Sequence, residues 1–194
     1  MTVGILALQG AFREHRRAFQ RLGVDSVEVR LPKHLKGLTG LIIPGGESSA
    51  ITKLMTTYGL DKAIKDFHRA GGGIWGTCAG AITVANQLPG HITQARLGLL
   101  AVSLERNAYG RQVNSFEVAL KISGFESLFP GVFIRAPKIV SIGKQVEVLS
   151  CFEECPVLVK SDRVLVSVFH PELTGDDRIH ALFANHICGE LIIT

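Results

Sequence analysis

The sequence predicts an α/β fold with a mostly parallel central sheet, helices on both faces and an antiparallel extension. In the first half of the 194 residues, short apolar runs alternate with helical patterns, as in successive βαβ units. After Gly98, short β-type runs follow one another between turn signals, without a strong helical period until the end. The length and a hydrophobic content of 46% suit a single domain, residues 1–194, with one core.

The first half begins with an apolar run from Val3 to Leu8, as expected of a parallel strand covered on both faces. A helix is expected from about Ala11 to Leu22, and Gly23 is placed to end it. The next expected elements are strands at Asp25–Leu31 and Leu41–Ile43, helices at Ser49–Tyr58 and Leu60–Ala70, and a short buried strand at Ile74–Trp75.

The first helix carries a basic cluster beside an apolar face. The cluster consists of Arg13, His15, Arg16, Arg17 and Arg21, and the apolar face of Phe12, Phe19 and Leu22. We interpret the cluster as a solvated helix face; a surface for a partner protein is the second interpretation and nucleic acid the third. The formal charge of +4 is too mild to decide among them.

The second half predicts strands and one last helix. The strands are expected at Leu99–Leu104, Val113–Ile122, Val132–Ile134, Val146–Ser150, Val157–Lys160 and Val164–Phe169. The helix is expected after Thr174, with Asp176 and Asp177 in its first turn, where acidic residues suit the helix dipole. Its predicted buried stripe is Ile179, Leu182, Phe183 and Ile187.

Cys78 lies in a segment typical of a nucleophile elbow. Gly76-Thr-Cys78-Ala-Gly80 follows the expected strand at Ile74–Trp75 and precedes a possible helix, the Gly-x-nucleophile-x-Gly pattern. Glycines permit the tight strand-to-helix turn, and a helix N-terminus favours a thiolate. The alternative is a buried structural cysteine in a glycine-rich connection.

His170 and Glu172 can supply the base and the orienting acid that such a cysteine needs. They follow the strand at Val164–Phe169, and Pro171 between them favours an extended backbone before it. In an extended segment, residues i and i+2 point to the same side, so we expect the carboxylate to orient the imidazole.

The loop Pro44-Gly-Gly-Glu-Ser48 is the third part of the expected site. Its glycines allow a close backbone approach, so Gly46 N–H is a candidate oxyanion donor together with Ala79 N–H, directly after the nucleophile. The same loop can also be a helix entry with Ser48 or Ser49 as N-cap. The run Gly71–Gly73 lacks the spacing of a dinucleotide-binding loop.

The remaining cysteines suggest neither a disulfide framework nor a metal site. Cys151 and Cys155 have no second ligand pair at a suitable spacing, and Cys188 is isolated. A reactive cysteine needs a reducing compartment, which predicts a cytoplasmic protein. Residues 70–95 contain no Asp, Glu, Lys or Arg, but their glycines and Pro89 make a poor membrane helix.

Together, these motifs resemble the class I (triad) glutamine amidotransferases and, within them, the family of glutaminase subunits of pyridoxal 5′-phosphate synthases. The resemblance covers essentially the whole chain. It rests on Leu8-Gln-Gly-Ala11 with Arg13-Glu-His15, Pro44-Gly-Gly-Glu-Ser48, Gly76-Thr-Cys-Ala-Gly80, Glu105-Arg-Asn107, Gly110-Arg-Gln112, Ser115-Phe-Glu117, Phe133-Ile-Arg-Ala-Pro137 and Phe169-His-Pro-Glu-Leu-Thr174. Asn114 departs from the aspartate usual in this family before Ser-Phe-Glu and lies outside the triad.

The resemblance implies a three-layer, flavodoxin-like class I amidotransferase fold and hydrolysis of L-glutamine to glutamate and ammonia. Ammonia would pass to a separate synthase subunit, in a hetero-oligomeric complex that makes pyridoxal 5′-phosphate. No cofactor or metal is implied, since pyridoxal 5′-phosphate is the product of the complex. Weak activity alone and strong activity with the synthase subunit are expected.

The resemblance also assigns roles. Cys78 is the expected nucleophile, His170 the general base and then acid, and Glu172 the orienter. The expected glutamine-binding residues are Gly46, Glu47, Ser48, Arg106, Ile134 and Arg135. A zwitterionic amino acid requires a carboxylate such as Glu47 near its ammonium and an arginine near its carboxylate, and which arginine serves stays open. Without the resemblance, Arg106 and Arg135 could equally be surface ion pairs.

Two alternatives remain at this stage. One is the glutaminase of another class I enzyme such as imidazole glycerol phosphate synthase, which should lack the Gly-Arg-Gln and Phe-Ile-Arg-Ala-Pro segments. The other is a non-catalytic binding subunit of the same fold, which intact Cys78, His170 and Glu172 argue against. Gln9-Gly10 and the basic first helix are candidate contacts for the synthase subunit.

Overall fold

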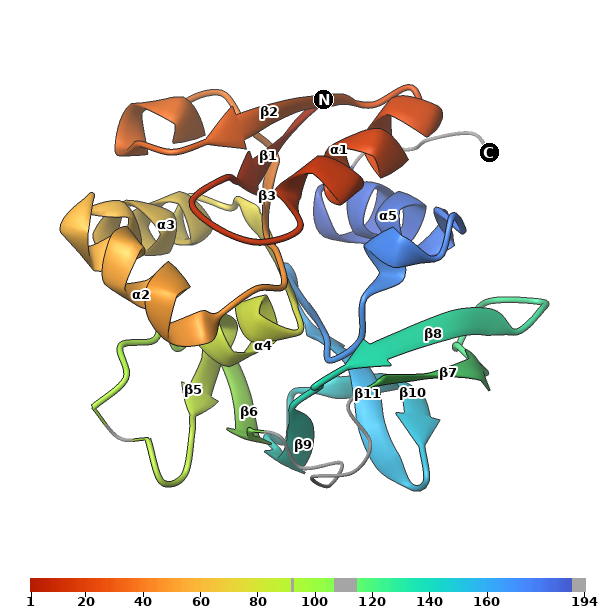
Figure 1. Cartoon of the computed structure of the whole chain (residues 1–194). Coiled ribbons are helices and arrows are strands. Elements are labelled where there is room, and N and C mark those ends of the chain that lie inside the picture. The colour runs from red at the N-terminus through yellow and green to blue at the C-terminus, as the bar shows by residue number, and fades with distance from the viewer. Residues whose placement is uncertain (92, 107–114, 190–194) are drawn as a thin grey trace.

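A computed structural model shows a seven-stranded sheet at the centre of the molecule (Figure 1). The structure describes residues 1–91, 93–106 and 115–189. The strand order is β10-β11-β12-β4-β3-β1-β2. The strands are β1 (Thr2–Leu6), β2 (Asp25–Val29), β3 (Gly40–Ile43), β4 (Gly73–Thr77), β10 (Glu147–Phe152), β11 (Cys155–Ser161) and β12 (Val164–Ser167). Strands β2, β1, β3, β4 and β12 pair in parallel, whereas β10 and β11 add an antiparallel edge, which confirms the predicted sheet.

Helices cover both faces of this sheet. They are α1 (Phe12–Arg21), α2 (Ser48–Thr57), α3 (Leu60–Arg69), α4 (Ala79–Val84) and α5 (Arg178–Leu182), which continues as the π-helical η3 (Phe183–Ile187); the short 3₁₀ helices are η1 (Pro32–Leu35) and η2 (Pro171–Leu173). Figure 1 shows α1 and α5 together on one side of the sheet and α2 and α3 on the other. The molecule therefore has the three layers that the resemblance implies.

The core lies where the central strands meet these helices. Strands β3, β4 and β12 are buried at every residue, because parallel strands covered on both faces expose neither side. Trp75 of β4 is fully buried, and its indole N–H donates to Ser167 Oγ of β12 at 3.1 Å. Phe183 of η3 packs against that indole, with ring centroids 5.5 Å apart. The central strands are thus held rigidly, and the segments that follow them inherit fixed positions.

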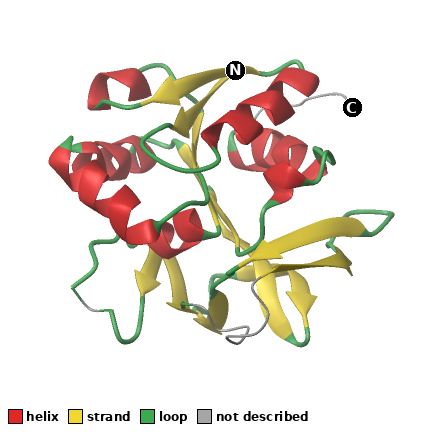
Figure 2. Cartoon of the chain, in the orientation of Figure 1, coloured by secondary structure: helices red, strands yellow, loops and turns green. Residues whose placement is uncertain are grey.

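Two smaller sheets extend the molecule beyond the helices (Figure 2). The first consists of β5 (Ala85–Gln87), β6 (Leu100–Glu105) and β9 (Lys138–Ile142), and the second of β7 (Ser115–Leu120) and β8 (Phe129–Ile134). The sequence did not predict β5 or β9. Strand β5 has only three residues, two of them exposed, and β9 is mostly exposed, so neither has the apolar pattern by which a strand is recognised.

The first helix corrects one prediction. His15 belongs to the predicted solvated basic face, yet it is fully buried. It lies three residues after Phe12 and four before Phe19, so it occupies the apolar face of the helix. It was assigned to the solvated face because histidine was grouped with the basic arginines. The arginines follow the prediction better, since Arg13, Arg16 and Arg17 are exposed.

The last helix agrees with the prediction in three of the four stripe residues. Ile179, Phe183 and Ile187 are buried, and Leu182 is half-buried. The two acidic residues precede the helix instead of forming its first turn, because α5 begins at Arg178. Asp177 accepts hydrogen bonds from Nε and Nη2 of Arg21, each at 2.7 Å, which joins this end of α5 to α1.

The structure describes the three remaining cysteines but not every motif residue. Cys151 and Cys155 are free thiols on the β10–β11 hairpin, and Cys188 is buried beside Gly40. Asn107, Gly110-Arg-Gln112 and Asn114 lie outside the described residues. Over the described part of the chain, we find no helix with the length and apolar character that a membrane crossing requires.

Candidate active site

Cys78 occupies a sharp turn between β4 and α4. Its backbone has φ 49° and ψ −104°, a conformation that a residue with a side chain rarely adopts. Its neighbours explain how the turn is possible. A Cβ on Gly80 would lie 1.8 Å from Ile43 O, and one on Gly76 would lie 2.6 Å from Gly80 O. The flanking glycines thus let the first turn of α4 pack directly on β3, and the turn presents Cys78 at the carboxyl end of β4.

His170 and Glu172 meet beside this turn. The imidazole Nδ1 lies 2.7 Å from Glu172 Oε1, and both residues are buried. The predicted extended geometry is wrong, because β12 ends at Ser167 and Pro171–Leu173 forms the 3₁₀ helix η2. Proline is favoured in the first turn of a helix as well as in extended segments, and here its fixed φ starts η2. The tight turn folds the carboxylate back onto the ring.

The surroundings of His170 favour its charged form. Burial alone would lower the pKa of the imidazole, but hydrogen bonds to the side chains of Cys78 and Glu172, and their negative charges, raise that pKa to about 10. For Glu172, burial opposes ionisation, whereas the hydrogen bond from His170 and the positive charge of that ring hold its pKa below the ordinary value. The pair therefore suits a His170 imidazolium that stays protonated beside Cys78.

A cavity of about 410 Å³ opens over the cysteine. Such a volume lies within the range of small-molecule sites. All of the residues that the sequence predicted for substrate and oxyanion binding line it, together with Cys78 and His170: Gly46, Glu47, Ser48, Ala79, Arg106, Ile134 and Arg135. Glu172 lies behind His170, away from the cavity lining.

The expected ligands of an amino acid lie close together in this cavity. Arg106 Nη2 is 3.4 Å from Glu47 Oε1, so a positive and a negative group adjoin the cysteine. Ile134 O lies 3.8 Å from Cys78 Sγ, and Arg135 follows with a positive φ of 44°. Ser48 Oγ is buried without a hydrogen-bond partner among the described residues.

Glu47 has a structural role as well. It is the N-cap of α2, and its carboxylate accepts from Ser49 N–H and Ala50 N–H at 3.2 and 2.7 Å. The alternative prediction of Ser48 or Ser49 as N-cap is therefore wrong. The bond from the Ser49 hydroxyl, the two cap bonds and Arg106 lower the pKa of Glu47 against the opposing effect of burial, and the carboxylate stays ionised.

Sequence reasoning missed three residues that shape the site. A Cβ on Gly45 would lie 2.4 Å from His170 Cε1, so only glycine leaves room for the imidazole. Gly45 N–H donates to Thr77 Oγ1 at 2.9 Å, and Gln9 Oε1 accepts from Glu47 N–H at 2.8 Å. The paired glycines after β3 were a usable signal for Gly45. Thr77 and Gln9 contact residues that are distant in the sequence, so a single sequence held no signal for these hydrogen bonds.

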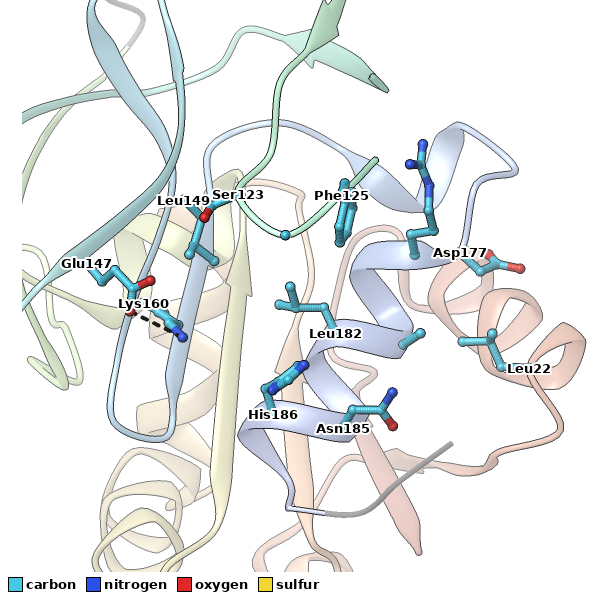
Figure 3. Close-up of a pocket in the computed structure, with 13 residues that line it drawn as sticks. Leu22, Ser123, Phe125, Glu147, Leu149, Lys160, Asp177, Leu182, Asn185 and His186 are labelled. Carbon is cyan, nitrogen blue, oxygen red and sulfur yellow. Dashed lines mark ion pairs between the residues drawn. The ribbon is translucent and has the colours of Figure 1, made fainter. Parts of the chain in front are cut away.

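A second cavity, of about 490 Å³, lies between α5 and the β10–β11 hairpin (Figure 3). Its lining includes Leu149, Leu182 and Phe125, and the Lys160–Glu147 ion pair, at 3.2 Å, lies at its edge. None of its lining residues is a cysteine or belongs to the predicted site. We therefore assign the candidate active site to the cavity over Cys78.

Comparison with known proteins gives one family. Residues 5–188 match the SNO glutamine amidotransferase family. A relative from Deinococcus radiodurans, pyridoxal 5′-phosphate synthase subunit PdxT, is 51% identical over 194 residues, which cover 98% of each chain. A protein of the same name from Thermus thermophilus is 51% identical over 182 residues, 93% of this chain and 95% of the relative.

Solved structures agree with the fold. One described as a glutamine amidotransferase superposes with a TM-score of 0.93 at 49% identity, covering 97% of this chain and 99% of the other. PurLQS from Thermotoga maritima superposes with a TM-score of 0.72 at 16% identity, covering 96% of this chain and 98% of the other, and supports the fold alone.

Proposed function

The chain belongs to the SNO glutamine amidotransferase family, and from this we propose that it is the glutaminase subunit of a pyridoxal 5′-phosphate synthase. It hydrolyses L-glutamine to L-glutamate and ammonia and delivers the ammonia to a separate synthase subunit. One observation supports the chemistry above all others. A cysteine on a strained strand-to-helix turn shares a cavity with a histidine that is paired to a buried glutamate at 2.7 Å.

Glutamine is held with its ionic end between Glu47 and Arg106. The Glu47 carboxylate receives the ammonium group, and Arg106 binds the carboxylate of the substrate. Gly46, Ser48, Ile134 and Arg135 complete the pocket around the side chain of the amino acid. Two opposite charges at one end of a cavity select an amino acid with a free ammonium and a free carboxylate.

In the first half-reaction, Cys78 Sγ attacks the side-chain amide carbon of glutamine. The C–S bond forms, and the carbonyl oxygen becomes an oxyanion against the N–H groups of Gly46 and Ala79. The C–N bond then breaks, and His170 gives its proton to the departing ammonia. The sulfur of Cys78 loses its negative charge when the C–S bond forms, so its support for the imidazolium disappears before the C–N bond breaks and His170 is a stronger acid when it must donate.

In the second half-reaction, water cleaves the γ-glutamyl thioester. His170, now neutral, removes a proton from the water, whose oxygen attacks the thioester carbon. The C–S bond breaks and glutamate leaves, with the thiolate and the imidazolium restored. Glu172 holds the ring in one orientation throughout, because its carboxylate stays on Nδ1 and leaves Nε2 to face the reacting atoms.

The partner and the compartment follow from the same proposal. Two relatives that are 51% identical to this chain carry the name pyridoxal 5′-phosphate synthase subunit PdxT. This name favours a role in pyridoxal 5′-phosphate synthesis over one in imidazole glycerol phosphate synthase. The chain works in a hetero-oligomeric complex with the synthase subunit. We place it in the cytoplasm, where the thiol of Cys78 stays reduced.

A glutamine-dependent synthesis assay with the purified synthase subunit tests the proposal. We expect the pair of proteins to form pyridoxal 5′-phosphate from glutamine, and the chain to release ammonia faster with the synthase subunit than alone. The Cys78→Ala variant should lose synthesis from glutamine, while added ammonium salt restores it. Absence of glutamine-dependent synthesis by the wild-type pair would refute the pathway, and equal rates with and without the partner would refute the coupling.

A further inference from the structure

A row of buried polar side chains extends from the candidate triad into the core. Glu172 Oε1 is bound to His170, but Oε2 is buried and has no hydrogen-bond partner among the described residues. His15 Nε2 of α1 lies 3.6 Å from this oxygen, and neither side chain has any exposed surface. Buried carboxylate oxygens are costly to leave unpaired, so this arrangement needs an explanation.

His15 is itself held by a second buried histidine. Its Nδ1 lies 2.9 Å from Nε2 of His180 on α5, and the two rings pack with Trp75 and Phe19. Burial lowers the pKa of both rings to about 3; Glu172 opposes this for His15, whereas the neighbouring histidines add to it, and Arg21 adds to it for His180. Both rings are therefore neutral near pH 7, and each has one donor and one acceptor nitrogen.

The hydrogen-bond pattern selects one arrangement of protons. If His180 Nε2–H donates to His15 Nδ1, then the proton of His15 is on Nε2 and faces Glu172 Oε2. The opposite arrangement would turn a lone pair of His15 toward the carboxylate. It would also bury His180 Nδ1–H, which has no partner among the described residues. Unpaired buried N–H groups are rarer than unpaired acceptors, so the first arrangement holds.

We propose that His15 is a positioning residue, which directs its Nε2–H at the outer oxygen of Glu172 and keeps that carboxylate aligned with His170. The inference rests on the proposed glutaminase function. Thr77 Oγ1, 3.4 Å from the same nitrogen, fixes the side of the ring and also accepts the N–H of Gly45 beside His170. Hydrogen bonds of catalytic groups often tighten only when substrate binds, which suits the 3.6 Å separation.

The row formed by His180, His15 and Glu172 connects helices α5 and α1 to the ring of His170. The titratable and charged groups that face His15 and His180 are His170, which directly precedes η2, Glu172 of η2, and Arg21 of α1, which is paired with Asp177. Among these groups, Glu172 is the one that places a negatively charged acceptor close to His15 Nε2. A carboxylate held at both oxygens cannot rotate away from His170 during turnover.

The test compares three variants at buried positions of α1. His15→Met removes the donor and keeps an apolar side chain; His15→Gln keeps an N–H donor at a similar distance. Phe19→Leu is the packing control, because Phe19 is equally buried and packs against His180 but has no group that can donate a hydrogen bond. Ammonia release with the synthase subunit gives kcat and KM, and thermal unfolding reports the fold.

We expect His15→Met to lower kcat about 10- to 100-fold with KM nearly unchanged, as for a misaligned catalytic group. His15→Gln should restore most of kcat, and Phe19→Leu should lower stability but not kcat. Histidine titration by NMR should show a lower pKa of the His170 ring in His15→Met, a readout that needs no turnover. Equal kcat in all variants, or equal losses in His15→Met and His15→Gln, would overturn the proposal.

The wild-type protein separates this inference from the proposed function. If the wild-type pair of subunits releases no ammonia from glutamine, the proposed function fails. If it does, and the His170 titration in His15→Met matches the wild type, only the positioning role of His15 fails.

Discussion

At the scale of single residues, the site depends on charges that the fold keeps in fixed states. His170 is held as an imidazolium by Cys78 and Glu172, while His15 and His180, one layer further in, are held neutral by burial. The pKa values of these neighbouring histidines differ because hydrogen bonds to Cys78 and Glu172 raise that of His170, whereas at His15 the effect of complete burial outweighs the charge of Glu172. This separation gives each ring a definite role.

The opposite shifts of these histidines predict how stability depends on pH. The unfolded chain binds a proton at His15 and at His180 near pH 6.5, whereas the folded chain does so only near pH 3. As pH falls below 6.5, the free energy of unfolding should therefore decrease, by up to about 1.4 kcal/mol per pH unit for each histidine. His170 acts in the other direction: the stability that it contributes is complete below pH 6.5 and is lost as pH rises toward about 10.

Urea unfolding from about pH 7 to about pH 4 measures the acid side of this dependence. His180→Phe, which removes one of the two neutral rings, should show a shallower decrease than the wild type. His186→Gln, an exposed residue of η3, is the control and should keep the wild-type slope. Identical slopes in the wild type and His180→Phe would contradict the assigned charge states.

A second residue-scale prediction concerns Glu47. Glu47→Gln removes the charge that faces the substrate ammonium but keeps an oxygen to cap α2. We expect KM for glutamine to rise about 10- to 100-fold, the usual effect of losing one charged hydrogen bond. Steady-state ammonia release measures it. Asp61→Asn, which makes the same change in net charge on α3, should leave KM unaltered; an unchanged KM in Glu47→Gln would remove Glu47 from the binding site.

The sequence predicted the reacting residues better than the residues that hold them in position. Cys78, His170 and Glu172 follow strand ends and carry recognisable spacing, so the sequence brings them to one edge of the sheet. His15 was misjudged because a histidine among arginines suggests a solvated face, although its spacing from Phe12 and Phe19 places it on the buried one. Contacts such as that of Gln9 with Glu47 join distant segments, and periodicity along the chain carries no information about them.

At the scale of elements, the site depends on two close contacts, one of helix α4 with strand β3 and one within the segment of η2. The first turn of α4 rests on β3 through Gly80, and η2 folds Glu172 onto His170. The strand before the elbow could be predicted because it is apolar on both faces. The 3₁₀ form of η2 could not, because proline suits both an extended segment and the start of a helix.

Gly80→Ala tests the elbow. Its Cβ would lie 1.8 Å from the backbone oxygen of Ile43, which no side-chain rotation can relieve. We expect a loss of about 1–3 kcal/mol or more in the free energy of unfolding, together with a large loss of kcat because Cys78 moves. Gly90→Ala is the control: a Cβ at this position would have no atom of the described residues within 4 Å beyond its chain neighbours, so only the strain of φ 77° remains and kcat should be unchanged. Wild-type stability and turnover in Gly80→Ala would contradict the packing described here.

At the scale of the whole molecule, the parallel sheet brings distant segments to one site. Gly45 and Gly46 follow β3, Cys78 follows β4 and His170 follows β12, and these three strands are neighbours in the sheet. Ligands of open α/β sheets bind outside the carboxyl ends of the strands, which is where the cavity lies. The alternation of strands and helices in the sequence was enough to predict this edge. The small sheets β5-β6-β9 and β7-β8 were harder to predict, yet β8 carries Ile134 into the cavity.

Detection of an acyl-enzyme on Cys78 is the decisive test of the proposed glutaminase chemistry. The wild-type protein, mixed with glutamine and the synthase subunit and quenched in acid, should carry a γ-glutamyl group on the peptide that contains Cys78. Cys78→Ala should carry none and release no ammonia, and Cys151→Ala, at an exposed free thiol, should behave as the wild type. Ammonia release by Cys78→Ala at the wild-type rate, or a γ-glutamyl group on another residue, would show that Cys78 is not the nucleophile.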